Sequence, residues 1–179
     1  VYARKGREAG DERFFREYIG KAMQDLKKAE RIILKLEKTK AIIPEETKAY
    51  NAIIYDRIGL LHFYKDDFPN AISYYKKAIA LDPNNHIYYN NLGGAYYLFG
   101  KYEVALNALN IAIDLNKDYT RAYKNRALVK FALGKYKEAK KDLKRAIDLD
   151  PILQEDKAIQ KILKEINDKL LKPKEPRQG

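Results

Sequence analysis

Hydrophobic and small residues recur along this chain with a period of 34 positions. Three segments fall into register, residues 52–85, 86–119 and 120–153. Within each segment these residues are spaced by three, four and seven positions, which predicts helices with one buried face. The matching sets are Tyr55, Tyr89 and Tyr123; Gly59, Gly93 and Ala127; Ala71, Ala105 and Ala139; and Ala78, Ala112 and Ala146.

Each segment is predicted to form a helical hairpin. Asp66, Gly100 and Gly134 occupy the same register position, where they permit a sharp turn between two helices. Asp82-Pro83 and Asp150-Pro151 end the second helix, because proline clashes with a continuing helix. One hairpin cannot bury its own apolar face, so neighbouring hairpins are expected to stack.

Both flanks also show helical patterns. Residues 11–40 carry a heptad seam, which we interpret as the second helix of a degenerate leading repeat that packs within the chain; a coiled-coil dimer is the alternative. Residues 42–47 are expected to form a loop and a helix start. Residues 154–172 have one apolar face, typical of a capping helix, and 173–179 are expected to be a disordered tail. The seam consists of Phe15, Ile19, Ala22, Leu26, Ala29, Ile33 and Leu36.

The middle segment resembles the tetratricopeptide repeat (TPR) pattern. Tyr89, Leu92-Gly93 and Tyr96 carry this resemblance, followed by Ala105, Leu109 and Ala112. It implies an all-α, right-handed superhelical solenoid of antiparallel helix pairs, with a long N-terminal helix and a C-terminal capping helix. The implied organisation is an N-terminal helical extension with a degenerate leading repeat (1–51), repeats 52–85, 86–119 and 120–153, the capping helix and the tail.

The resemblance also implies a function without catalysis. First helices of successive TPR units line a concave groove, so we expect a protein–protein interaction scaffold or adaptor that binds an extended, acidic segment of a partner and supports assembly of a larger complex. Asparagine amides pair with peptide backbone, and arginine and lysine attract carboxylates. The expected peptide-binding residues are Arg57, Phe63, Asn90, Asn91, Tyr97, Arg121, Lys124 and Asn125.

One subfamily feature is expected to be missing. Chaperone-binding TPR domains hold a C-terminal carboxylate with Lys and Asn in the first repeat, Asn in the second, and Lys and Arg in the third. Asn91 matches, and Arg121 is a plausible substitute, with Asn125 at the last position. The first-repeat pair is replaced by Asp56 and Leu60. Asp56 would repel a carboxylate, so the full clamp is not expected.

Charge leaves two further functions open. The chain has 36 basic and 25 acidic residues, a net charge of +11. Lys137, Lys140, Lys141 and Lys144 lie in the second helix of the third segment, where a solvated outer face is the favoured interpretation. Contact of this face with nucleic acid or a membrane surface is the alternative. The rivals to a peptide-binding adaptor are a nucleic-acid-binding solenoid and a self-assembling scaffold.

Candidate chemistry is sparse. The chain has no cysteine and two histidines: His62 takes an aromatic slot of the repeat, and His86 is expected to be exposed at a helix start. Ser73 has no histidine in its own helix, and Met23 lies on the heptad face, where a core role is the simplest interpretation. We therefore expect no enzyme, cofactor or metal site. No window is apolar enough to span a bilayer. A monomeric cytoplasmic protein is expected, but Val1 in place of Met leaves a removed leader or anchor open.

Overall fold

The computed structural model describes residues 9–39 and 44–171, which contain eight α-helices, one short 3₁₀ helix and no strand. The all-α fold predicted from the sequence is thus confirmed for this part of the chain. In order the elements are α1 (Ala9–Lys38), α2 (Pro44–Tyr64), α3 (Phe68–Leu81), α4 (His86–Leu98), α5 (Tyr102–Leu115), α6 (Thr120–Ala132), α7 (Tyr136–Leu149), η1 (Pro151–Glu155) and α8 (Lys157–Leu171).

The chain forms two compact units, Val1–Pro83 and Asn84–Gly179. The first contains α1 to α3, and the second contains α4 to α8. Each unit has hydrophobic clusters of its own. We therefore describe each unit by itself.

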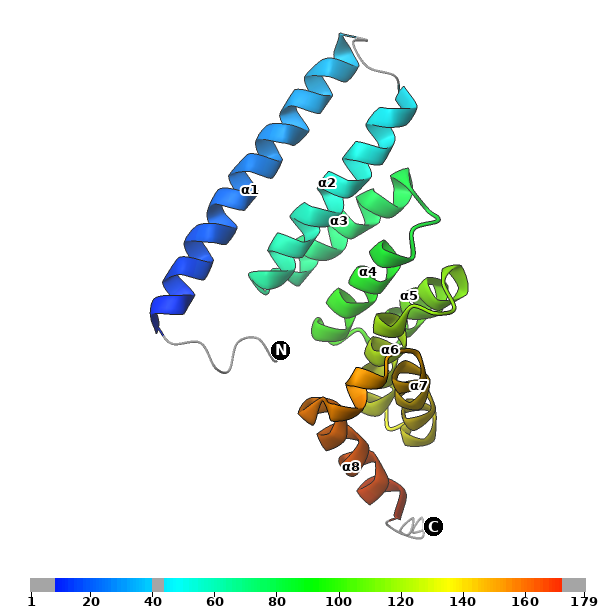
Figure 1. Cartoon of the computed structure of the whole chain (residues 1–179). Helices are drawn as coiled ribbons and strands as arrows, with labels where there is room; N and C mark the ends of the chain where they lie inside the picture. The colour runs from blue at the N-terminus through cyan, green and yellow to red at the C-terminus, as the bar shows by residue number, and fades with distance from the viewer. Residues whose placement is uncertain (1–8, 40–43, 172–179) are drawn as a thin grey trace, which may run out of the picture. The chain divides into compact units, whose positions relative to one another are not determined.

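In the first unit α1 lies alongside α2 (Figure 1). Ile19 and Met23 of α1 are buried against Ile58 and Leu61 of α2, with Ala22, Leu26, Ile54 and Tyr74 packed around them. This part of the seam packs within the chain, as predicted. The side chains of two seam residues, Phe15 and Ile33, lie outside the described residues, as does the expected loop before Pro44.

The hairpin turns lie where the sequence places them. Asp66, Gly100 and Gly134 all have positive φ, at 59°, 77° and 72°. The left-handed conformation reverses the chain and costs glycine little, whereas aspartate pays a modest steric penalty. Each turn is followed by the second helix of a pair, α3, α5 or α7.

Close helix packing explains the repeated small residues. All six repeated alanines, at positions 71, 78, 105, 112, 139 and 146, are fully buried. A Cβ on Gly59 would lie 2.8 Å from the ring of Tyr75, and one on Gly93 would lie 2.6 Å from Leu109 Cγ. Paired helices therefore approach at the small residues, while a large side chain fills the space beside them.

The second unit ends differently from the sequence expectation. In place of one helix over 154–172, the chain forms η1 and then α8 from Lys157. Asp156 Oδ1 accepts hydrogen bonds from the backbone N–H groups of Ala158 (2.8 Å) and Ile159 (3.3 Å), which favours a new helix start. α8 then buries Ile159, Ile162 and Ile166 against α6 and α7. The expected tail, 173–179, lies outside the described residues.

None of the described helices is long and apolar enough to cross a membrane.

Candidate functional site

The eight expected peptide-binding residues divide between the two units. Arg57 and Phe63 lie on α2 in the first unit, where Arg57 is exposed and Phe63 makes edge contacts with Tyr64 and Phe68. The other six lie on α4 and α6 in the second unit. They are Asn90, Asn91, Tyr97, Arg121, Lys124 and Asn125.

Three asparagines form a hydrogen-bonded row from α6 to α4, which we call the amide row. Asn125 Nδ2 donates to Asn90 Oδ1 at 2.9 Å, and Asn90 Nδ2 donates to Asn91 Oδ1 at 3.4 Å. Asn90 is only 5% exposed, so it lies beneath its neighbours. Its bonds fix the orientation of the more accessible Asn125 and Asn91 amides, because an amide with one group bonded cannot rotate without losing that bond.

Tyr97 lies deeper than a simple groove residue. Its ring contacts Tyr102 with centroids 5.8 Å apart, and it packs against the buried cluster of Ala105, Leu106, Leu109 and Val129. Tyr97 is therefore half-buried and helps to hold α4 against α5.

Arg121 and Lys124 face a pocket that does not include the amide row. This hollow has a volume of about 320 Å³ and lies where the α5–α6 turn meets the end of α7 and η1. We call it the third-repeat pocket. The sequence analysis selected the two cations of this pocket and missed its other lining residues. Those of the α7–η1 turn, Asp150 and Leu153, come close to α6 only when the chain is folded. It is lined by Asp118, Tyr119, Thr120, Arg121, Lys124, Asp150 and Leu153.

A buried ion network holds α6 to α7, and the sequence analysis did not find it. Arg126 donates two hydrogen bonds of 2.8 Å to the carboxylate of Asp142, and Lys130 Nζ lies 2.8 Å from the same group. Asp142 is 3% exposed, and Arg126 also donates to Asn110 Oδ1 at 2.8 Å. Burial alone would lower the pKa of Arg126, but the hydrogen bonds and charge of Asp142 raise it above its ordinary value.

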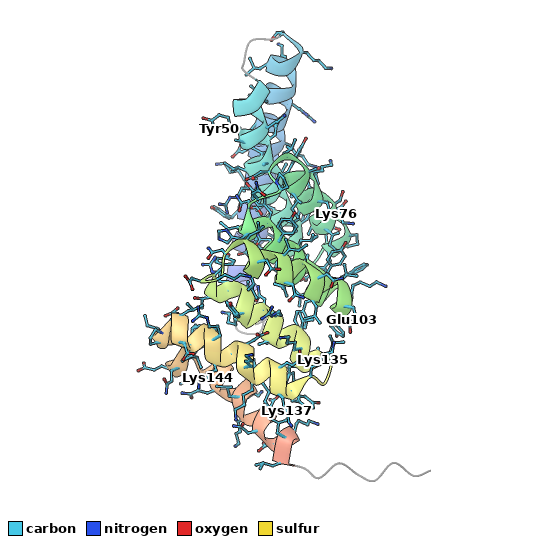
Figure 2. All side chains as sticks on the ribbon, turned by 90° about the vertical axis from the view of Figure 1, so that its right-hand side faces the viewer. Tyr50, Lys76, Glu103, Lys135, Lys137 and Lys144 are labelled. Carbon is cyan, nitrogen blue, oxygen red and sulfur yellow. The ribbon has the colours of Figure 1, made fainter. Side chains whose placement is uncertain are left out.

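The lysines of α7 are exposed. Figure 2 shows Lys137 and Lys144 along one side of this helix. Lys140 Nζ donates to Asn167 Oδ1 of α8 at 2.8 Å, and Lys141 is exposed as well. Exposed lysines fit the predicted solvated face, and nothing about them selects an anionic partner.

Both histidines contact an aromatic ring and a polar side chain. His62 stacks on Tyr74, and its Nδ1 lies 2.8 Å from Asp67 Oδ2, in keeping with the packing role expected for it. His86 was expected to be exposed, but it is half-buried, because its ring meets Tyr119 edge-on and its Nε2 lies 3.2 Å from Asn116 Nδ2. Among the residues that the structure describes, no cluster of three or more His, Cys, Asp or Glu side chains could hold a metal ion.

The two departures from the chaperone-binding clamp lie on α2. Asp56 is 3% exposed, and Leu60 is half-buried. Burial, and next the negative charge of Asp56, raise the pKa of Tyr75, which places this carboxylate near the hairpin interior. Asp56 is therefore part of the packing in the first unit.

Comparisons with known proteins agree with the repeat pattern. Sequence models of the tetratricopeptide repeat match residues 57–120 and 120–152. No curated protein matches the chain.

Solved structures similar to this chain include TPR domains of one protein. The first TPR domain of Spaghetti (RPAP3), solved with the HSP90 peptide SRMEEVD, is 32% identical, with 69% of this chain and 96% of that chain covered and a TM-score of 0.66. The first TPR domain of human RPAP3 is 33% identical over 68% and 94%, with a TM-score of 0.64. The second human domain, solved with the HSP70 peptide SGPTIEEVD, is 30% identical over 69% and 98%, with a TM-score of 0.60. The chain therefore belongs to the tetratricopeptide repeat family.

Proposed function

We propose that this protein is a non-enzymatic interaction adaptor that binds an extended, acidic segment of a partner protein and supports assembly of a larger complex. Related TPR domains at 30% identity or more were solved with the peptides SRMEEVD and SGPTIEEVD, each of which carries two adjacent glutamates and a final aspartate. These relatives support a peptide ligand for this chain as well.

The amide row is the observation that carries this proposal. Its hydrogen bonds place the amides of Asn91 and Asn125, from two different helices, on either side of the buried Asn90. A side-chain amide offers both a donor and an acceptor, which match the C=O and N–H groups of an extended backbone. Arg121 and Lys124 lie on the same helix as Asn125, and their charges favour acidic groups in the bound segment.

The ligand is expected to differ from the peptides of the relatives. Asp56 and Leu60 offer no cation to a carboxylate, and Asp56 belongs to the packed interior. We therefore expect SRMEEVD to bind this chain at least about tenfold more weakly than it binds the first domain of Spaghetti, since one lost charged hydrogen bond costs roughly 1.5–3 kcal/mol. Fluorescence anisotropy with the labelled peptide measures both affinities side by side. Equal affinities would show that the first-repeat residues are dispensable.

A library of labelled acidic peptides, screened on the full chain, tests the proposed function. For peptides that bind, Asn91→Ala and Asn125→Ala should each lower the affinity about fivefold or more, in line with the net value of about 1 kcal/mol for a hydrogen bond. The outer-face triple variant Lys137→Glu, Lys140→Glu and Lys141→Glu serves as the control. We expect it to keep its affinity for a peptide held on the other side of the repeat.

The same variants separate the nucleic-acid alternative. A labelled single-stranded oligonucleotide that meets the lysines of α7 would lose affinity steeply with salt and would be released by the outer-face triple variant. If no peptide binds while the oligonucleotide behaves in this way, the adaptor proposal is wrong and the α7 face is the binding site.

A further inference from the structure

The outer side of α1 carries a row of cations. Positions 21, 24, 28, 31, 35 and 38 recur at intervals of three and four, on the side of the helix opposite the buried Ile19 and Met23. They hold five cations, one glutamine and no acid, and all five cations are exposed. The row extends about 25 Å along the helix. We call it the basic row, and it consists of Lys21, Lys28, Arg31, Lys35 and Lys38.

The basic row has no ionic partner in the described part of the chain. None of its side chains makes an ion pair, a hydrogen bond or a ring contact with another of the described residues. Arg31, Lys35 and Lys38 also have no carboxylate three or four positions away, where Glu17 and Asp25 stand to Lys21. Like charges at this spacing repel one another and destabilise a helix slightly. An anionic surface over the row would relieve that repulsion.

The lysines of α7 form a different kind of surface. Two exposed acids, Glu138 and Asp148, lie among them, and Lys140 donates to Asn167 Oδ1 of α8. None of the exposed side chains of α7 is apolar. Mixed charge of this sort is typical of a solvated helix face, whereas the basic row of α1 carries one sign of charge only.

Two exposed apolar side chains border the basic row. Ile32 is 50% exposed and lies four positions after Lys28 and three before Lys35. Tyr18 is 63% exposed and lies three positions before Lys21. Lysines beside an aliphatic and a phenolic side chain suit the interface of an anionic bilayer, which offers phosphates and, just beneath them, apolar chains. The phosphate backbone of a nucleic acid would pair with the cations but would leave Ile32 in water.

We propose that the outer side of α1 docks on an anionic phospholipid surface, with the basic row against the headgroup phosphates and with Tyr18 and Ile32 at headgroup level. The opposite side of α1 packs on α2, so docking requires no rearrangement of the first unit (Figure 1). None of the expected peptide-binding residues lies on α1, so this inference goes beyond the adaptor function and does not depend on it. An adaptor docked in this way would hold its partner at a membrane.

Flotation of the full chain with lipid vesicles tests the proposal. Vesicles of equimolar phosphatidylcholine and phosphatidylglycerol should bind the chain, and added salt should weaken this binding. Vesicles of phosphatidylcholine alone should bind it poorly. A chain that ignores the anionic vesicles, or that binds both kinds equally, would overturn the proposal.

Charge variants locate the contact on α1. Lys28→Gln, Arg31→Gln and Lys35→Gln together should weaken vesicle binding about tenfold or more, since each basic residue near an anionic bilayer contributes roughly fivefold. The matched control Lys137→Gln, Lys141→Gln and Lys144→Gln removes the same charge from α7 and should have little effect. Equal losses in the two triple variants would show that net charge alone governs binding and would overturn the assignment to α1.

A single fluorophore tests the depth of the contact. The chain has no tryptophan, so Ile32→Trp introduces the only indole. Its emission should shift to shorter wavelength when anionic vesicles are added, because the ring leaves water for the interface. Ile53→Trp on α2 is the control, since Ile53 is 49% exposed and lies on a different helix. A shift in the control variant with none at position 32 would contradict docking through α1.

A labelled single-stranded oligonucleotide tests the other anionic partner. If the chain binds it, loses it in the α1 triple variant and does not float with anionic vesicles, the basic row is a nucleic-acid site and the proposal is wrong. Lys28→Arg, Arg31→Lys and Lys35→Arg together retain the charge and should retain vesicle binding. Circular dichroism of each variant confirms that the helices are still formed. The α1 variants should keep their affinity for library peptides, so failure of this proposal leaves the adaptor function untouched.

Discussion

Gly93 shows how a single missing side chain determines the distance between two helices. A Cβ at this position would lie 2.6 Å from Cγ of Leu109, a side chain with no exposed surface in which to move. Overpacking of a core costs about 1–3 kcal/mol, and the better helix propensity of alanine returns up to about 1 kcal/mol. We expect Gly93→Ala to lower the free energy of unfolding by about 1–2 kcal/mol, measured by urea denaturation.

Gly20 provides the control for this substitution. It also lies inside a helix, but a Cβ there would have no neighbour within 4 Å. Gly20→Ala should therefore stabilise the chain by up to about 1 kcal/mol through helix propensity alone. If both alanine variants were stabilised equally, close approach would not be the reason for a glycine at position 93.

Asp67 links the start of α3 to pH. Its carboxylate accepts hydrogen bonds from Asn70 Nδ2 (2.8 Å) and the Asn70 backbone N–H, and His62 Nδ1 lies 2.8 Å away. The side-chain hydrogen bond from Asn70 is the main reason that the pKa of Asp67 lies below its ordinary value. A lowered pKa in the folded state means that this carboxylate stabilises the fold above its unfolded pKa, and that the contribution is lost as the pH falls through the folded value.

We expect Asp67→Ala to destabilise the first unit by about 1 kcal/mol at neutral pH, the usual value of a helix N-cap. The difference from the unaltered protein should shrink in acid, because protonation removes the advantage of the native carboxylate. Thermal unfolding monitored by circular dichroism from neutral to acidic pH measures this convergence. A difference that stays constant down to strongly acidic pH would show that the ionised form of Asp67 contributes nothing.

Within the helix pairs, the same two positions of the 34-residue repeat carry different kinds of side chain in each repeat. In the first hairpin His62 stacks on Tyr74; the residues 34 positions later are Tyr96 and Ala108, and those of the third repeat are Lys130 and Asp142. The contacting pair of the first hairpin and that of the third thus differ at both positions. The ion pair of the third repeat replaces an aromatic contact at the same site.

This exchange predicts the outcome of a graft. Asp142→Ala alone leaves Arg126 and Lys130 without their carboxylate and should cost about 3–5 kcal/mol, as for other broken buried pairs. Arg126→Leu, Lys130→Tyr and Asp142→Ala together install the residues of the middle repeat, Leu92, Tyr96 and Ala108. We expect the triple variant to recover most or all of the lost stability, because well-packed apolar groups often match a buried ion pair.

Chemical denaturation of the single and triple variants measures both values. A triple variant as unstable as Asp142→Ala would mean that the third repeat cannot use the packing of the second. Loss of the hydrogen bond to the exposed Asn110 should matter little, since water replaces it.

Local features of the fold could be predicted from the sequence, and contacts across helices could not. The turns at Asp66, Gly100 and Gly134 and the six buried alanines follow from spacing, because a periodic pattern determines which face of a helix is covered. The network around Asp142 depends on which side chains meet across a hairpin. The paired changes at matching register positions were the available signal, and the sequence analysis did not use it.

The candidate site was predictable to a similar degree. The TPR register predicted that the candidate binding residues of the second unit, Asn91 and Arg121 among them, lie on α4 and α6. Burial of Asn90 could not be predicted, because it depends on the packing of α6 against α4, where Asn125 donates a hydrogen bond to it. The third-repeat pocket also depends on η1, which interrupts a stretch with a continuous helical pattern.

For the molecule as a whole, net charge is a poor guide to its partners. The chain carries a charge of +11, yet several cations of the second unit form ion pairs within the chain, with Asp142, Asp118 and Glu103. The pairs with Asp142 are largely buried and belong to the packing, whereas the more exposed pairs with Asp118 and Glu103 add little to stability. The cations that remain for a ligand are better identified from their contacts and from the shape of the surface around them.

The seam of α1 leads to a prediction about assembly. Ile19 and Met23 are buried against α2, so this face is already occupied within one chain. Beside this face lie Tyr18 and Ile32, with Asp25 between them at heptad spacing, and a charge at that position disfavours a coiled coil. We therefore expect a monomer at micromolar concentrations, measured by sedimentation velocity.

Two variants test the assignment of these faces. Leu26→Asp should lower the melting temperature of the first unit without changing the sedimentation coefficient, because Leu26 packs against the cluster of Ile19, Met23 and Ile58. Ile32→Asp, on a half-exposed residue, should change neither quantity. A dimer that Leu26→Asp dissociates while the helix content is retained would contradict the intrachain packing. In that case α1 would pack against a second chain, and the face of α2 that carries Ile58 and Leu61 would need another partner.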